Sequence, residues 1–211
     1  MRLSEQAWPV LVSKVRLGRD EYRVVRPARP VEGALLYRDG FGVQFDVGRR
    51  AATAFAMAWA LAGRSPHSLV HLPLRTASPS EGVRPLDLVL LHHRLGFPIS
   101  RWKEVRARLG AGARHSVTLP PRAFRRTLDL SRPYDACRDH LRWGVAADTL
   151  FLTGSHAAFE MEIDVVRALA EESPARIAAS RKDHCCAEIG MGRHWLDRRS
   201  PAAELHVEYS R

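Results

Sequence analysis

The chain has 211 residues, of which 45% are hydrophobic and 27% are charged. This length and composition suffice for a hydrophobic core without disulfides or metals, and they exclude a disordered chain, a collagen-like chain and a disulfide-stapled small protein. The formal net charge is +10, from 33 basic and 23 acidic residues, which favours an anionic partner.

Arginine supplies almost all of the positive charge, since only Lys14, Lys103 and Lys182 are lysines. The planar guanidinium binds phosphate and carboxylate groups through paired hydrogen bonds, so an arginine-rich surface suits nucleic acid. Codon usage in a GC-rich genome is an alternative source of the arginines. The position of the charge along the chain is therefore more informative than its total.

The first third of the chain predicts β-strands. Residues 8–17 and 22–25 are rich in β-forming side chains. Residues 34–38 and 41–47 flank Asp39-Gly40, a pair typical of hairpin turns, and hydrophobic side chains alternate along the second run. We therefore predict a β-hairpin over residues 34–47 with one buried face.

A helix and two further strands are expected next. The Ala-rich run 51–62 predicts a buried helix that ends at Gly63. Its 12 residues are far fewer than the ~20 that cross a bilayer. Strands are expected at 68–74 and 86–92, with a surface loop at 76–84 between them.

The middle of the chain predicts two helices separated by a strand. The first helix, residues 100–109, is expected to begin at Ser100 as its N-cap and to bury Trp102. The strand spans residues 115–119 and stops at two prolines. The second helix is expected over residues 134–143, with Cys137 as a buried thiol.

The last third predicts a strand, a long helix and a final strand. Residues 149–153 form the first strand, and Ser155 is expected to cap a helix over residues 156–171. Acidic residues of this helix, Glu160 among them, are spaced so that they face solvent. The final strand is expected over residues 204–209.

The irregular alternation of strands and helices predicts an α+β fold. We expect a single compact domain over residues 1–211, with a mixed or largely antiparallel sheet, an N-terminal hairpin region and several packing helices. The loop near residues 76–85 is the one position where a subdivision is considered.

The cysteines indicate a reducing compartment. Cys137, Cys185 and Cys186 are an odd number without a C-x-x-C pair, unlike the even and regular cysteines of secreted disulfide frameworks. The N-terminal residues contain an acid and no apolar core of a signal peptide. We therefore expect a cytoplasmic protein without a membrane partner.

Positive charge concentrates between residues 101 and 126, where eight basic residues accompany one acid, Glu104. Residues 151–211 carry eight basic and ten acidic groups, so the excess is local. Aromatic rings within the basic segment could stack on unpaired bases, or belong to the core beneath snorkelling arginines. The predicted anion-binding residues are Arg101, Lys103, Arg106, Arg108, Arg114, Arg122, Arg125 and Arg126.

The densest cluster of reactive side chains lies at residues 184–189. On a strand, His184, Cys186 and Glu188 would share one face, because side chains alternate with a period of two. This trio offers either a thiolate with a base and a carboxylate, or ligands for zinc with His194 as a further candidate. A purely structural role in a late strand is the alternative.

Three functional hypotheses follow, with no cofactor predicted. The first is a basic protein that binds DNA, RNA or another polyanion through the segment 101–126. The second is an interaction or assembly module whose basic segment docks on an acidic protein or on a second copy. The third is a small thiol- or metal-dependent enzyme that uses His184, Cys186 and Glu188.

Overall fold

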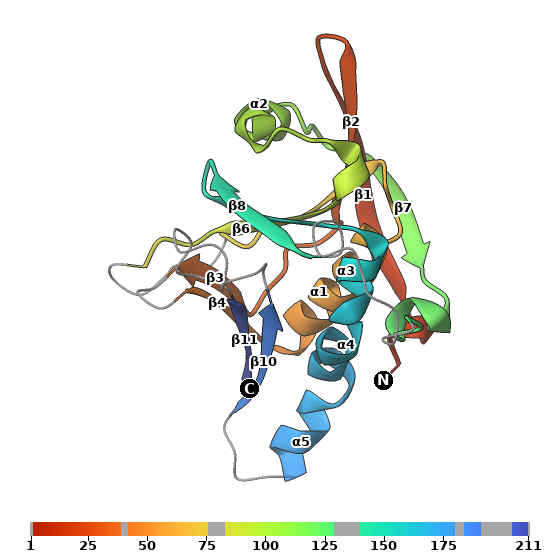
Figure 1. Cartoon of the computed structure of the whole chain (residues 1–211), viewed down its shortest axis with the longest axis vertical. Helices are drawn as coiled ribbons and strands as arrows, with labels where there is room; N and C mark the ends of the chain where they lie inside the picture. The colour runs from red at the N-terminus through yellow and green to blue at the C-terminus, as the bar shows by residue number, and fades with distance from the viewer. Residues whose placement is uncertain are drawn as a thin grey trace.

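Two β-sheets pack against a shared group of helices in the computed structural model (Figure 1). The structure describes residues 2–38, 42–75, 83–128, 140–179, 184–190 and 204–210. The strands are β1 (Ala7–Leu17), β2 (Asp20–Pro27), β3 (Ala34–Arg38), β4 (Val43–Val47), β5 (Ser68–Leu72), β6 (Asp87–His92), β7 (Ala113–Thr118), β8 (Arg142–Ala146), β9 (Thr149–Gly154), β10 (His184–Gly190) and β11 (Glu204–Ser210). The helices are α1 (Arg49–Ala62), α2 (Trp102–Ala107), α3 (His156–Met161), α4 (Ile163–Glu171) and α5 (Ser173–Ala179), with short 3-10 helices η1 (Leu3–Glu5), η2 (His93–Leu95), η3 (Ile99–Arg101) and η4 (Pro121–Phe124).

The larger sheet has seven strands in the order β7-β1-β2-β5-β6-β9-β8. The pairs β2–β5 and β6–β9 are parallel, whereas the other neighbours are antiparallel. Strand β1 buries Val10 on one face and Val15 and Leu17 on the other, because different halves of the strand are covered from opposite sides. The predicted mixed sheet is therefore confirmed.

The smaller sheet has four strands in the order β10-β11-β4-β3. Its β3–β4 hairpin pairs Ala34 with Val47, and Val43, Phe45 and Val47 are buried as the alternating pattern predicts. The Asp39-Gly40 turn lies outside the described residues. Strand β11 pairs in parallel with β4 and antiparallel with β10, so it joins the end of the chain to the hairpin.

Helix α1 lies at the centre of the main core (Figure 1). Ten of its fourteen residues are buried, which matches its Ala-rich and almost wholly apolar sequence. The indole Nε1 of Trp59 donates a hydrogen bond to the carbonyl of Phe159 at 2.8 Å, and the Phe55 ring meets Phe45 edge to face at 5.2 Å. This core includes buried residues from both sheets.

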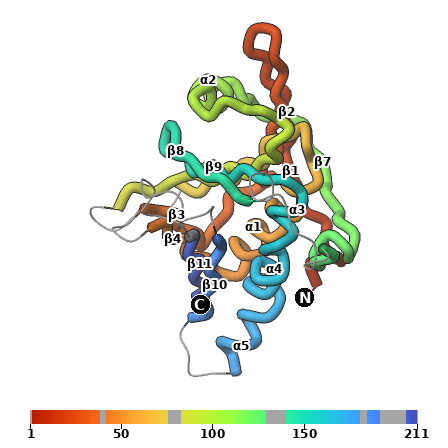
Figure 2. The backbone as a smooth tube through the Cα atoms, viewed as in Figure 1, coloured from red at the N-terminus to blue at the C-terminus, as the bar shows by residue number. Residues whose placement is uncertain are grey.

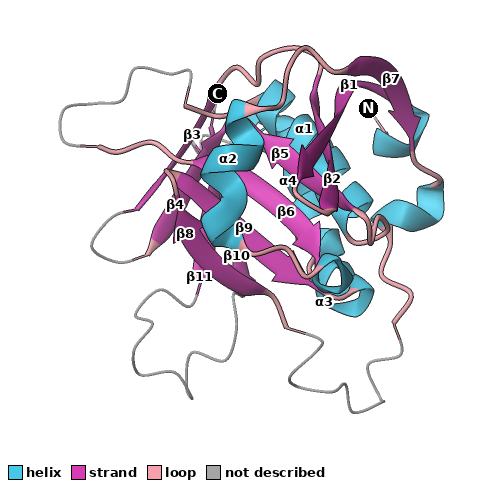
Figure 3. Cartoon of the chain, turned by 90° about the horizontal axis from the view of Figure 1, so that it is seen from above, coloured by secondary structure: helices cyan, strands magenta, loops and turns pink. Residues whose placement is uncertain are grey.

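Helix α2 covers the opposite face of the seven-stranded sheet (Figure 3). Trp102 has no exposed surface, and its Nε1 donates a hydrogen bond to Thr149 Oγ1 at 2.9 Å. A second core forms here between α2 and the sheet, and it includes Leu17 and Phe151. The sheet is thus buried on both faces over part of its width.

Two predicted helix boundaries are wrong. Arg101, not Ser100, precedes α2, because residues 99–101 form the 3-10 turn η3 that leads directly into the helix. Residues 134–139 of the predicted helix 134–143 lie outside the described residues, but Arg142 and Trp143 belong to β8, which pairs antiparallel with β9. The turn Ala147-Asp148 joins β8 to β9, and pairing within this hairpin makes Arg142 and Trp143 part of a strand, which the helix-like spacing of residues 134–143 does not indicate.

The predicted helix 156–171 is divided at Glu162 into α3 and α4. Ser155 caps α3 as expected, since its hydroxyl accepts a hydrogen bond from the amide of Ala158. The predicted exposure of Glu160 is wrong: this residue is 3% exposed. Its carboxylate accepts a hydrogen bond from the Thr127 hydroxyl at 2.6 Å, which replaces the water it gives up.

Strands and helices mix irregularly in this chain, so its fold is α+β as predicted. The single domain over residues 1–211 stays a prediction, and residues 76–82 of the considered boundary lie outside the described residues. In the described part of the chain, no helix has both the length and the apolar character needed to cross a membrane.

Candidate anion-binding surface and pocket

The basic segment 101–126 runs along three parts of the fold. Its first residues lie on and beside α2, Arg114 lies on the edge strand β7, and its last residues lie on and just after η4. The chain passes from α2, which lies on a face of the seven-stranded sheet, to the edge strand β7 and then down to η4 (Figures 1 and 2). The predicted patch is therefore an extended surface that reaches from α2 to the β7 edge and η4, rather than one compact surface.

Two of the predicted cations fix α2 in place instead of facing a partner. Arg101 forms an ion pair with Asp20 at 2.6 Å and lies over the Tyr22 ring. Arg106 donates a hydrogen bond to the carbonyl of Ala147 at 2.8 Å and lies 3.5 Å from the buried carboxylate of Asp87. Their charges are thus largely neutralised within the protein.

Five of the predicted cations are exposed and have no carboxylate partner among the described residues. Arg108 donates a hydrogen bond to the carbonyl of Arg16, at 3.3 Å. This free-cation set consists of Lys103, Arg108, Arg114, Arg122 and Arg125. The eighth predicted cation, Arg126, lies 3.6 Å from Asp164 in a half-exposed pair.

The large aromatic rings of the segment belong to the core, which was the alternative to base stacking. Trp102 is fully buried and Phe124 is 2% exposed. His115 is exposed on β7 and is the only one of the three rings in this segment that solvent reaches. The exposed edge therefore offers charge but little aromatic surface.

A pocket of about 620 Å³ lies at the end of this edge, between the N-terminal segment, η4 and α4. Four arginines and two carboxylates line it: Arg2, Arg125, Arg126, Arg167, Asp164 and Glu171. Arg126 and Arg167 are held by acids, with Arg167 3.2 Å from Glu171. Arg2 and Arg125 have no acidic partner among the described residues, so the pocket carries an uncompensated positive charge.

Two carboxylates hold the walls of this Arg pocket. Glu171 accepts a hydrogen bond from the amide of Leu3 at 2.8 Å, which fixes the segment that carries Arg2. Glu160 accepts from both the amide and the hydroxyl of Thr127, which fixes the segment that carries Arg125. Burial would raise the pKa of Glu160, but the hydrogen bonds from Thr127 and the nearby His156 and Arg64 outweigh it and lower the pKa, so this anchor is ionised.

Sequence reasoning missed Arg2 and Arg167 as part of the pocket. They lie 165 residues apart in the chain and outside the charged window, and neither has a local motif. Only the packing of η1 and η4 against α4 brings them together.

The second predicted cluster lies on the four-stranded sheet. His184, Cys186 and Glu188 share the exposed face of β10, as the period of two predicts. His194 lies outside the described residues. The group of ligand atoms within 4.8 Å of one another contains Cys186 together with His206 and Glu208 of β11. Sequence reasoning missed these two, although the alternating pattern of residues 204–209 placed both on the polar face of their strand.

The electrostatics of this sheet oppose a thiolate nucleophile. Partial burial, followed by the charges of Glu208 and Glu188, raises the pKa of the Cys186 thiol. Burial and Glu208 likewise raise the pKa of Asp46 on the neighbouring strand β4. A reactive cysteine requires the opposite surroundings, with cations or helix N-termini that lower its pKa.

Family models, curated proteins and solved structures were compared with this chain, and none matches it.

Proposed function

We propose that this protein binds nucleic acid through the phosphate backbone, along the edge formed by the free-cation set and ending in the Arg pocket. The observation that carries the proposal is the convergence of four arginines from three separate elements on one pocket with only two carboxylates. Arginine is suited to phosphate because its donors match two oxygens at once.

The binding is expected to depend on charge more than on sequence. Trp102 and Phe124 are buried, so they offer no platform on which bases can stack. Backbone contacts position a protein on nucleic acid without reading its sequence. Oligonucleotides of different sequence and equal length should therefore bind with similar affinity.

Fluorescence anisotropy with labelled DNA and RNA oligonucleotides at several salt concentrations tests the proposal. Affinity should fall with salt at a log–log slope of about −0.9 per phosphate contacted in duplex DNA. The double variant Arg122→Ala/Arg125→Ala should weaken binding and make this slope shallower by about 2, one contact for each removed arginine.

A matched control removes the same net charge elsewhere. Arg50 and Arg176 are exposed and paired with Glu32 and Glu172, outside the free-cation set. Arg50→Ala/Arg176→Ala should leave the salt slope unchanged. If both double variants weaken binding equally, only the total charge matters and the proposed surface is wrong.

The interaction-module hypothesis predicts a different outcome. A basic edge that docks on an acidic protein or a second copy would give self-association or a protein complex in light scattering, and no anisotropy change with oligonucleotides. We also propose that the protein is cytoplasmic. Its described cysteines, Cys185 and Cys186, are both free thiols, and they would stay reduced in that compartment.

A further inference from the structure

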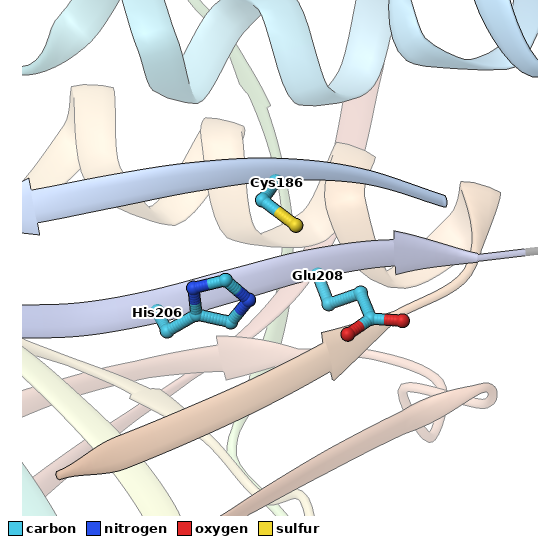
Figure 4. A group of neighbouring side chains, drawn as sticks. All are labelled: Cys186, His206 and Glu208. Atoms are coloured by element: carbon cyan, nitrogen blue, oxygen red, sulfur yellow. The ribbon is translucent and has the colours of Figure 1, made fainter. Parts of the chain in front are cut away.

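Three side chains with metal-binding atoms meet on the outer face of the four-stranded sheet. Cys186 lies on β10, and His206 and Glu208 lie on the neighbouring strand β11 (Figure 4). Their ligand atoms all lie within 4.8 Å of one another. The strand register places Cys186 directly beside Glu208, so the backbone itself brings the thiol and the carboxylate together.

His206 is oriented by a fourth residue. Its Nδ1 contacts a carboxylate oxygen of Glu188, the residue opposite it on β10. This contact leaves Nε2 as the free ring nitrogen, and in Figure 4 one ring nitrogen points toward the space beside Cys186 and Glu208. Metal-binding histidines commonly hold their second nitrogen in this way, because a carboxylate fixes both the tautomer and the ring orientation.

The donor set selects among metal ions. Magnesium and calcium take oxygen ligands, whereas zinc accepts a thiolate, an imidazole and a carboxylate in one tetrahedral site. With Zn–S of about 2.3 Å and Zn–N of about 2.0 Å, tetrahedral ligand atoms lie about 3.5 Å apart. The observed group has to contract by little more than 1 Å at most, and Cys186 is exposed, so its side chain is free to rotate.

We propose that Cys186, His206 and Glu208 form a zinc-binding site, with Glu188 as the residue that orients His206. Three protein ligands leave one tetrahedral position for a water molecule. A thiolate, a carboxylate and a neutral imidazole together carry two negative charges, which balance the two positive charges of Zn²⁺. The site is separate from the Arg pocket and does not depend on nucleic-acid binding.

The surroundings favour a cation. Asp46 on β4 lies opposite Glu208 in the strand register, and Glu188 flanks His206, so two further carboxylates lie beside the three ligands. In a chain with a net charge of +10, this sheet concentrates negative charge. Zinc would also connect β10, an edge strand, to β11 through side chains as well as through backbone hydrogen bonds.

Zinc binding to the untagged, EDTA-treated full chain tests the proposal. We expect one Zn²⁺ per chain in competition with a chromophoric chelator, and thiolate-to-metal absorption when Co²⁺ replaces Zn²⁺. Cys186→Ser should remove the Co²⁺ absorption and weaken zinc binding at least tenfold. Glu188→Gln should weaken it by roughly 10- to 100-fold, as for other residues that orient a ligand.

Cys185→Ser is the matched control, because Cys185 is adjacent in sequence but packs against the core. It should leave the zinc affinity unchanged. A second measurement needs no variant: Zn²⁺ should protect Cys186 of the wild-type protein from iodoacetamide, as mapped by peptide mass spectrometry. Zinc binding that survives Cys186→Ser, or equal alkylation of Cys186 with and without Zn²⁺, would overturn the site.

Discussion

Asp87 is the clearest place where a single charge stabilises the fold. Its side chain is 5% exposed and lies 3.1 Å from Arg75 Nε and 3.5 Å from Arg106 Nη1. It also accepts a hydrogen bond from the amide of Leu74 at 2.9 Å. Asp87 therefore ties α2 and the chain after β5 to the start of β6.

The pKa of Asp87 gives the size of this effect. Burial alone would raise it, but nearby His71, the Leu74 amide and Arg75 lower the pKa from 3.8 to about 2. Burial also lowers the pKa of His71, so this imidazole is neutral at pH 7 and the arginines and the amide carry the stabilisation there. At ~1.4 kcal/mol per pKa unit, the whole shift corresponds to ~2.5 kcal/mol of folding free energy, and the part that does not require a charged His71 is smaller, about 1–2 kcal/mol.

Asp87→Asn keeps the shape and an acceptor for the Leu74 amide but removes the charge. Urea denaturation at pH 7 should show a loss of about 1–2 kcal/mol in the free energy of unfolding. The depressed pKa means that the folded state binds fewer protons, so the wild type loses this stability as the pH falls from about 4 to 2. Most of the difference between the two proteins should be gone at pH 2, and they should become equally stable below it.

Asp148→Asn is the control for this prediction. Asp148 is 68% exposed and pairs with the same Arg75 at 3.3 Å, so its loss should cost less than about 0.5 kcal/mol. The reasoning is refuted if Asp87→Asn costs no more than Asp148→Asn at pH 7, or if its cost is the same at pH 2 as at pH 7.

Three further predictions concern stability. Burial, followed by the charges of His93 and Arg94, lowers the pKa of His92 to about 4. The unfolded state therefore binds a proton that the folded state does not, and the free energy of unfolding should fall by up to about 3 kcal/mol between pH 6.5 and 4. His92→Asn keeps an acceptor for the Arg94 amide and should make this fall smaller in urea titrations. Ala147 has φ 47° in the β8–β9 turn, so Ala147→Gly should raise the free energy of unfolding by about 0.5 kcal/mol, whereas the same change at Ala146 in β8 should lower it. Glu160→Gln should speed amide hydrogen exchange at Thr127, because the Thr127 amide loses its charged acceptor. Unchanged exchange would mean that Glu160 does not anchor this segment.

Local patterns were sufficient for the elements whose two faces differ. The β3–β4 hairpin, α1 and β11 follow from alternation or from an almost wholly apolar run, because the strands bury one face and α1 buries ten of its fourteen residues. The pattern failed at Arg142 and Trp143, where pairing with β9 determines the structure. It also failed at Glu160, whose partner Thr127 lies 33 residues earlier.

The candidate sites show the same limit. The sequence located the exposed cations Arg122 and Arg125. It could not show that Arg101 and Arg106 form ion pairs with Asp20 and Asp87, because these pairs join segments that are distant in the chain. For the cysteine cluster, strand alternation predicted which face Cys186 occupies. The identity of its neighbours depends on the register between β10 and β11. Because 13 residues outside the described ranges separate the two strands, the sequence does not determine this register.

The two proposed sites are compatible because the fold separates their charges. The free-cation set extends from α2 to the β7 edge and η4, and the proposed zinc ligands lie on the four-stranded sheet at the other side of the molecule from β7 (Figures 1 and 2). Interactions between exposed charges are screened beyond about 8 Å at physiological salt. The carboxylates of the zinc site therefore do not weaken phosphate binding at the β7 edge, and the arginines do not repel zinc. A polyanion on the β7 edge leaves the metal site open to solvent, so either site can be occupied without the other.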